Sequence, residues 1–76
     1  LIELKPFGKT ETERNKIKSE KFVYILEGEI ELKINTENFI LKKNNSIYFD
    51  SHQMHYLQNL TNKISKAIVV VTPTNL

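Results

Sequence analysis

The sequence has no cysteine, only two glycines among its 76 residues, and no long hydrophobic run. Without cysteine, neither a disulfide nor a zinc site built on thiolates can stabilise the fold. With so few glycines, the chain has no glycine-rich phosphate loop. The longest apolar runs, Phe22–Leu26 and Ala67–Val71, are far shorter than the roughly 20 residues that span a membrane. A domain this small therefore needs support from a metal with other ligands, from self-association or from a neighbouring domain.

A large excess of charge of one sign is also missing. Eleven Lys and Arg side chains stand against nine Asp and Glu, which leaves a net charge of +2. A charge this small and this interspersed does not indicate a nucleic-acid surface. No signal-peptide pattern is present, so we expect a cytoplasmic protein without membrane contact. The sequence begins at Leu1 rather than at methionine, and we expect residues 1–76 to be a single domain taken from a longer chain.

The pattern that is present is one of short β-strands separated by turns. Ile30, Leu32 and Ile34 alternate with charged residues, which predicts a strand with one buried and one solvated face. Phe22–Leu26 is apolar at both parities, which predicts a strand covered on both faces. No window has helical periodicity. We therefore predict an all-β domain, either a jelly-roll barrel or a two-sheet antiparallel β-sandwich.

Both histidines lie at a corner between two of these strands. Ser46–Phe49 reads as a strand, the polar residues 50–53 as a turn, and the chain becomes strand-like again at His55. A side chain that re-enters a sheet after a corner points inward from the rim, where ligands bind. His55 is therefore the first candidate for ligand contact, and a hydrogen bond to the rim is the alternative. Tyr48 is more typical of a core, and Tyr56 fits either a core or a pocket.

Two stretches resemble the cupin family. They are Tyr24–Ile30 and Ser46–Asp50, and the likeness extends from Gly8 to Pro73. The chain is most similar to the small cupin at the C-terminus of many bacterial helix-turn-helix (XRE-type) repressors. Cupins carry the motifs G-x5-H-x-H-x4-E-x6-G and G-x5-P-x-G-x2-H-x3-N, and the spacing of both is kept here. The resemblance implies the cupin-type jelly roll.

The resemblance also implies where a metal would lie, because cupin motifs supply four metal ligands. His55 matches the histidine of the second motif, and Asn59 matches its asparagine. The three ligand positions of the first motif carry Arg14, Lys16 and Lys21. Ammonium and guanidinium groups have no free lone pair at neutral pH, so they cannot bind a metal. We therefore expect no metal and no cofactor.

Three cations at that position predict an anionic ligand, unless the side chains turn out to water. Arg14 and Lys16 share a face of an extended strand, and Lys21 joins them if the motif geometry holds. A carboxylate or phosphate would bind them through charge-assisted hydrogen bonds. The expected partner is a small organic anion that acts as effector. The expected ligand-contacting residues are His55, Lys21, Arg14, Lys16, Tyr48 and Tyr56.

Three functions remain open at this point. The first is an effector-sensing and dimerising domain of a transcription regulator, which contacts DNA only through an upstream domain. The second is a small enzyme that acts on a sugar or small acid, with His55 and Tyr48 or Tyr56 as acid and base. The third is a structural dimerisation domain with a filled barrel. We expect a homodimer because the outward side chains of Phe22–Leu26 need a partner surface.

Overall fold

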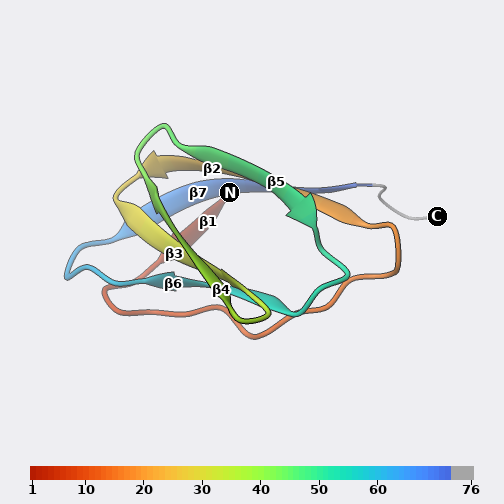
Figure 1. The fold of residues 1–76 in the computed structure, drawn as a ribbon. Helices are drawn as coiled ribbons and strands as arrows, with labels where there is room; N and C mark the ends of the chain where they lie inside the picture. The colour runs from red at the N-terminus through yellow and green to blue at the C-terminus, as the bar shows by residue number, and fades with distance from the viewer. Residues whose placement is uncertain (73–76) are drawn as a thin grey trace.

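The computed structural model describes residues 1–72 and shows an all-β fold without helices in that range (Figure 1). Its strands are β1 (Ile2–Leu4), β2 (Glu20–Glu27), β3 (Glu29–Ile34), β4 (Glu37–Lys42), β5 (Ser46–Asp50), β6 (His55–Asn59) and β7 (Ser65–Thr72). All their pairings are antiparallel. The predicted all-β fold is confirmed. Pro73, where the resemblance ends, lies outside the described residues.

The strands form two sheets that pack face to face. The larger sheet has the order β1-β7-β2-β5, and the smaller sheet has the order β4-β3-β6. The long segment between β1 and β2 runs beside β6, where single bridges join Lys9 to Gln58 and Glu13 to His55 (Figure 1). This segment therefore extends the smaller sheet beyond β6 and covers its free edge.

The core lies between the sheets and follows the alternation of the sequence. Ile30, Leu32 and Ile34 of β3 are buried, as predicted, and so are Val23 and Ile25 of β2. The other parity of β2 points to the outer face of the larger sheet, where Phe22 is 36% exposed and Leu26 is 37% exposed. Lys21 shares the inward parity of Val23 and Ile25, and it is also buried. The strand thus carries a cation into an apolar interior.

The sandwich has two ends, which we name after the two residues at the ends of β6. The His55 end holds the β5–β6 corner and the β3–β4 turn, and the Asn59 end holds the β2–β3 turn and the β6–β7 loop (Figure 1). Gly28 in the β2–β3 turn has φ +84°, and a Cβ there would lie 2.2 Å from the Ser65 Oγ atom. Only glycine fits this turn. Within residues 1–72, no helix is long and apolar enough to cross a membrane.

Candidate binding site

A cluster of polar side chains lies inside the sandwich near its His55 end. The Lys21 Nζ atom is 2.7 Å from Glu13 Oε1 and 2.8 Å from His55 Nε2. Glu13 Oε1 lies 3.9 Å from His55 Nε2. We call these three residues the Lys21 cluster. It joins β2, β6 and the long segment between β1 and β2.

The backbone explains why these side chains converge. Lys21 points inward by the parity of β2. Glu13 and His55 exchange two backbone hydrogen bonds, with N···O distances of 2.8 and 3.0 Å. Residues that pair directly in an antiparallel ladder project their side chains to the same face, so Glu13 points inward beside His55. A single bridge in an otherwise irregular segment thus places the carboxylate.

The hydrogen bonds define the protonation of His55. Its Nδ1 atom lies 2.7 Å from the carbonyl oxygen of Gln53, which can only accept, so Nδ1 carries the hydrogen. In the neutral ring Nε2 is then the acceptor, and Lys21 donates to it. Burial lowers the pKa of His55, and the charge of Lys21 acts in the same direction. At neutral pH the imidazole is therefore uncharged.

Glu13 is the anion of the cluster. The hydrogen bond from Lys21 lowers the pKa of Glu13 and outweighs the opposing effect of desolvation. The side chain of Glu13 is 53% exposed, whereas that of Lys21 is 7% exposed. The cluster therefore contains a buried ammonium, a carboxylate that reaches it from the surface, and a neutral imidazole.

The cluster faces a cavity of about 80 Å³ between the sheets. This volume suits two or three water molecules at about 30 Å³ each. Phe49 closes one side, and its ring meets that of His55 edge-on with centroids 5.2 Å apart. The polar lining comes from Thr10 and the Lys21 cluster. The apolar lining is Ile2, Val23, Leu32, Phe49, Leu57 and Val69.

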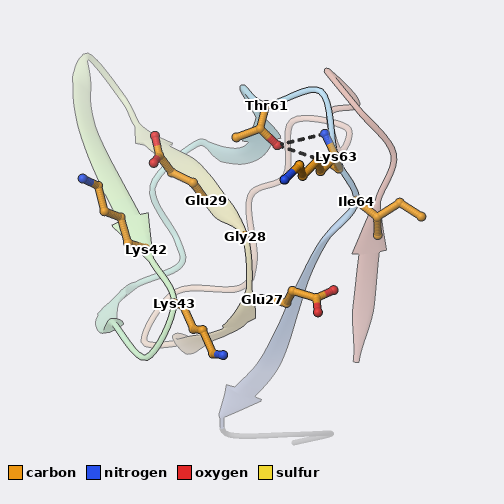
Figure 2. Close-up of a pocket in the computed structure, with 8 residues that line it drawn as sticks. All are labelled: Glu27, Gly28, Glu29, Lys42, Lys43, Thr61, Lys63 and Ile64. Carbon is orange, nitrogen blue, oxygen red and sulfur yellow. Dashed lines mark hydrogen bonds between the residues drawn. The ribbon is translucent and has the colours of Figure 1, made fainter.

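A larger hollow of about 730 Å³ lies at the Asn59 end (Figure 2). Its charged side chains are spread around the rim rather than directed at one point (Figure 2). Lys42, Lys43, Lys63 and Glu27 are all exposed there. No buried charged side chain lines this hollow, so nothing fixes a ligand in one orientation. The smaller cavity is the better candidate site.

Arg14 and Lys16 do not line the cavity, and both are exposed. The expected convergence of three cations is therefore wrong. Because Glu13 pairs with His55 and points inward, the next residue along the extended chain points away. Lys16 lies past the bridge, in a turn where its carbonyl oxygen accepts from the Ser19 N–H at 3.0 Å. Lys21 alone of the three reaches the interior, and ligand contact by the other two stays a prediction.

The two tyrosines also lie outside the cavity. Tyr48 is 59% exposed, and its hydroxyl donates to Glu20 Oε1 at 2.6 Å. That hydrogen bond raises the pKa of Tyr48. Tyr56 is half-buried, with the Lys9 ammonium 4.5 Å from its ring centroid. The structure does not bring either tyrosine to Lys21, and ligand contact by them stays a prediction.

Asn59, at the other end of β6, is fully buried and fully hydrogen-bonded. Its amide nitrogen lies 3.1, 3.1 and 2.6 Å from the carbonyl oxygens of Leu4, Lys5 and Lys63, so its two hydrogens are shared among three acceptors. Its oxygen accepts from the backbone N–H and the hydroxyl of Thr61. Asn59 thus fastens the end of β1 to the β6–β7 loop, and it is a structural residue.

The donor set of the Lys21 cluster does not fit a divalent metal. The lone pair of His55 Nε2 is directed at an ammonium group 2.8 Å away, where a metal would have to lie. Residues 1–72 contain no group of three or more His, Cys, Asp or Glu side chains arranged to hold a metal. A divalent ion needs three or four such donors. Lys21 provides the positive charge instead.

Comparisons with known proteins agree on the fold. The family model described as "Cupin domain" matches residues 1–71. The tetracenomycin polyketide synthase protein TcmJ of Streptomyces glaucescens is 28% identical over 72 residues, covering 95% of this chain and 48% of that protein. The chain thus spans about half the length of this curated relative.

Two solved structures illustrate the range of proteins with this fold. The cupin domain of an XRE family transcriptional regulator from Enterobacter cloacae has a TM-score of 0.89 at 19% identity, covering 96% of this chain and 77% of that one. A predicted oxalate decarboxylase from Thermotoga maritima has a TM-score of 0.81 at 22% identity, covering 91% and 59%. At such identities the likeness concerns the fold alone.

Proposed function

This chain belongs to the cupin domain family, and we propose that it is a binding module that holds a small organic anion at Lys21, whose ammonium is oriented by His55. We propose further that the module serves as the sensing and dimerising domain of a transcription regulator, whose DNA contacts are made by another domain. The observation that supports anion binding is the buried ammonium of Lys21, which faces an apolar cavity beside a neutral imidazole. DNA contact by this domain itself is not proposed, because its net charge is only +2.

The electrostatics of the cavity favour an anion over a neutral or cationic ligand. A buried charge is costly unless it is paired, and the apolar lining offers Lys21 no further counter-charge besides Glu13. The ammonium has three N–H donors, of which Glu13 and His55 use two. An anion would receive a charge-assisted hydrogen bond worth about 1.5–3 kcal/mol. A neutral sugar would gain less from the same contact.

The regulator role is supported by the high structural similarity to the cupin domain of an XRE family regulator. The alternative is an enzyme, since a predicted oxalate decarboxylase has the same fold. Within the described residues the cavity offers His55 and Glu13 as general base candidates, and the ammonium of Lys21 already binds both of them. Tyr48 cannot act with His55, because it lies on the outer face of the larger sheet. The geometry thus favours binding over catalysis.

A thermal-shift titration with small carboxylates, phosphate and neutral sugars tests anion binding. We expect the parent protein to be stabilised by at least one anion and by no sugar. Lys21→Met should abolish the stabilisation, whereas Lys42→Met, which removes an exposed lysine of β4, should keep it. Stabilisation by sugars alone would contradict the proposal and favour the alternative that acts on a sugar. Stabilisation by no compound would contradict it and favour the structural role with a ligand-free cavity.

The proposed dimer uses the outer face of the larger sheet. Phe22 pairs with Val70 and Tyr24 pairs with Ile68 across β2 and β7, which makes one continuous apolar strip. Ile68 is 38% exposed and Val70 is 43% exposed. No charged side chain interrupts these four residues, so the strip can pack against a copy of itself about a twofold axis.

Sedimentation velocity tests the dimer with a matched pair of variants. Ile68→Glu places a charge inside the strip and should convert the dimer to monomer at micromolar concentration. Ile40→Glu changes a comparably exposed isoleucine, 46% against 38%, on the smaller sheet and should leave the dimer intact. A monomeric parent protein, or equal behaviour of the two variants, would be evidence against this interface.

A further inference from the structure

We infer that the ligand of the Lys21 cluster is a short aliphatic carboxylate, and that it binds by displacing the carboxylate of Glu13 from Lys21. This inference rests on the proposed anion binding and adds the chemical class of the anion and its competitor within the chain. In the absence of ligand, the carboxylate of Glu13 therefore occupies the position on Lys21 that the ligand carboxylate would take. The inference follows from the unequal exposure of the two charged partners and from the lining of the cavity.

Of the two charged groups, Glu13 is the one that can move. Its side chain is 53% exposed, and one oxygen makes its contact with Lys21 at 2.7 Å. The carboxylate can therefore turn to water, where its charge is well solvated. The side chain of Lys21 cannot turn to water in this way, because it is only 7% exposed and its neighbours on the inward face of β2 are buried. An arriving anion would find the ammonium fixed and the carboxylate exchangeable.

The lining of the cavity selects the ligand class. The ammonium of Lys21 is the cationic group that lines it, and most of the remaining wall is aliphatic or aromatic. A ligand carboxylate at the position of the Glu13 carboxylate could direct a short alkyl chain toward Leu32, Leu57 and Phe49. A cavity of about 80 Å³ accepts a chain of only a few carbons. Inorganic phosphate has no apolar part to bury there, so it should bind more weakly.

His55 sets a further requirement. Its Nε2 atom is an acceptor and holds one N–H of Lys21, so the imidazole offers the ligand no donor. An anion must therefore be held by Lys21 alone among the charged side chains of the cavity. The carboxylate of the ligand and that of Glu13 compete for the ammonium of Lys21, and at close range they repel each other in a site of low dielectric constant. Displacement of Glu13 relieves this repulsion.

Displacement would also change how one segment is held. Within residues 1–72, Glu13–Lys21 is the hydrogen bond that joins the segment 9–16 to β2. The other contacts of the segment go to β6 and the corner before it, through backbone bonds at Thr10, Glu13 and Asn15. A bound ligand would release the link to the larger sheet and leave the links to the smaller one. Ligand binding in the cavity would thus change how the surface segment 9–16 is attached to the domain.

Isothermal titration calorimetry with acetate, propionate and butyrate tests the inference on the whole chain. Glu13→Gln keeps the shape of the side chain but removes its charge, and it should raise carboxylate affinity by about tenfold or more, since a charged competitor is lost. Glu11→Gln, an exposed change in the same segment, should leave affinity unchanged. Inorganic phosphate should bind less tightly than butyrate. If Glu13→Gln unfolds, Glu13→Ala, which removes both the charge and the contact with Lys21, should give the same gain.

A second measurement separates displacement from simple repulsion. The carboxyl carbon of Glu13, followed by NMR, should titrate at a higher pH when the protein is saturated with butyrate, because Lys21 no longer lowers the pKa of Glu13. Carboxylate binding with unchanged affinity in Glu13→Gln, or with an unchanged Glu13 titration, would overturn the displacement and leave the proposed function standing. Absence of binding in the parent and in both Glu13 variants would overturn the two together.

Discussion

His55 and Asn59 occupy opposite ends of β6, and they are buried to a similar degree, with 3% and 0% exposure. Their hydrogen-bond partners differ. Asn59 binds three backbone carbonyls and the N–H and hydroxyl of Thr61 in a loop two residues away. His55 Nε2 binds a side chain, that of Lys21, whose other partner is a half-exposed carboxylate. Backbone partners are fixed by the fold, whereas side-chain partners can exchange, so equal burial does not mean equal roles.

The comparison predicts its largest effect at Asn59. Asn59→Ala should lower the free energy of unfolding by about 3 kcal/mol or more, because several buried backbone groups lose their partners at 1–3 kcal/mol each. Asn62→Ala, an exposed asparagine in the neighbouring loop, should change it by less than about 0.5 kcal/mol. Urea unfolding followed by circular dichroism measures both. A mild effect of Asn59→Ala would show that the loop rearranges and that the two ends of β6 are more alike than the hydrogen bonds indicate.

A smaller effect is expected at the other end of the strand. Lys21→Met should change the free energy of unfolding by about 1 kcal/mol or less. Methionine fills the apolar space of the lysine stem, and the half-exposed Glu13 can turn to water rather than stay buried without a partner. The same urea experiment applies. A loss as large as that of Asn59→Ala would make the Lys21 cluster a structural element and remove the contrast between the two ends.

The smallest effect concerns pH. The pKa of His55 is lowered below its ordinary value of 6.5, so below pH 6.5 the unfolded chain takes up a proton that the folded chain resists. The pKa of Glu13 is lowered from 4.5, so stability falls further as pH drops through the folded-state pKa of Glu13. Both shifts predict that stability decreases from neutral pH toward acid.

His55→Gln should flatten the part of this decrease that lies near pH 6, and His52→Gln should not. Thermal melts of the parent and the two variants at several pH values provide the check. A parent protein that gains stability between pH 7 and pH 5 would contradict the neutral, buried state of His55 and with it the hydrogen bond from Lys21.

The strand pattern could be predicted from sequence, because alternation along one strand is a local property, and Ile30, Leu32 and Ile34 show this clearly. The inward direction of Lys21 could not be predicted in this way, because Phe22–Leu26 is apolar at both parities, and only the motif position suggested it. The role of Glu13 was missed. Its direction depends on one bridge to His55, a residue distant in the sequence, within a segment that has no alternating pattern.

At Arg14 the family motif predicted an inward side chain where the structure has an exposed one. Motif spacing places that residue at a ligand position, but the bridge at Glu13 fixes the inward parity one residue earlier. Asn59 matched its motif position without revealing what it does, because its partners are carbonyls that only the folded chain brings together. Local signals thus define the elements, and pairings between distant segments define the site.

The pairing of β1 with β7 has a consequence for how the domain folds. Ile2 lies opposite Ala67, and β2 is flanked by β5 and β7, whose residues lie 22 or more positions along the chain from their partners in β2. A topology dominated by such distant contacts closes large loops before it gains much native energy, and it folds in milliseconds to seconds rather than microseconds. Lys21 and His55, separated by 34 positions, meet only when both sheets have formed. The binding site should therefore be among the last features to assemble, and a partly folded chain should have no affinity for the ligand.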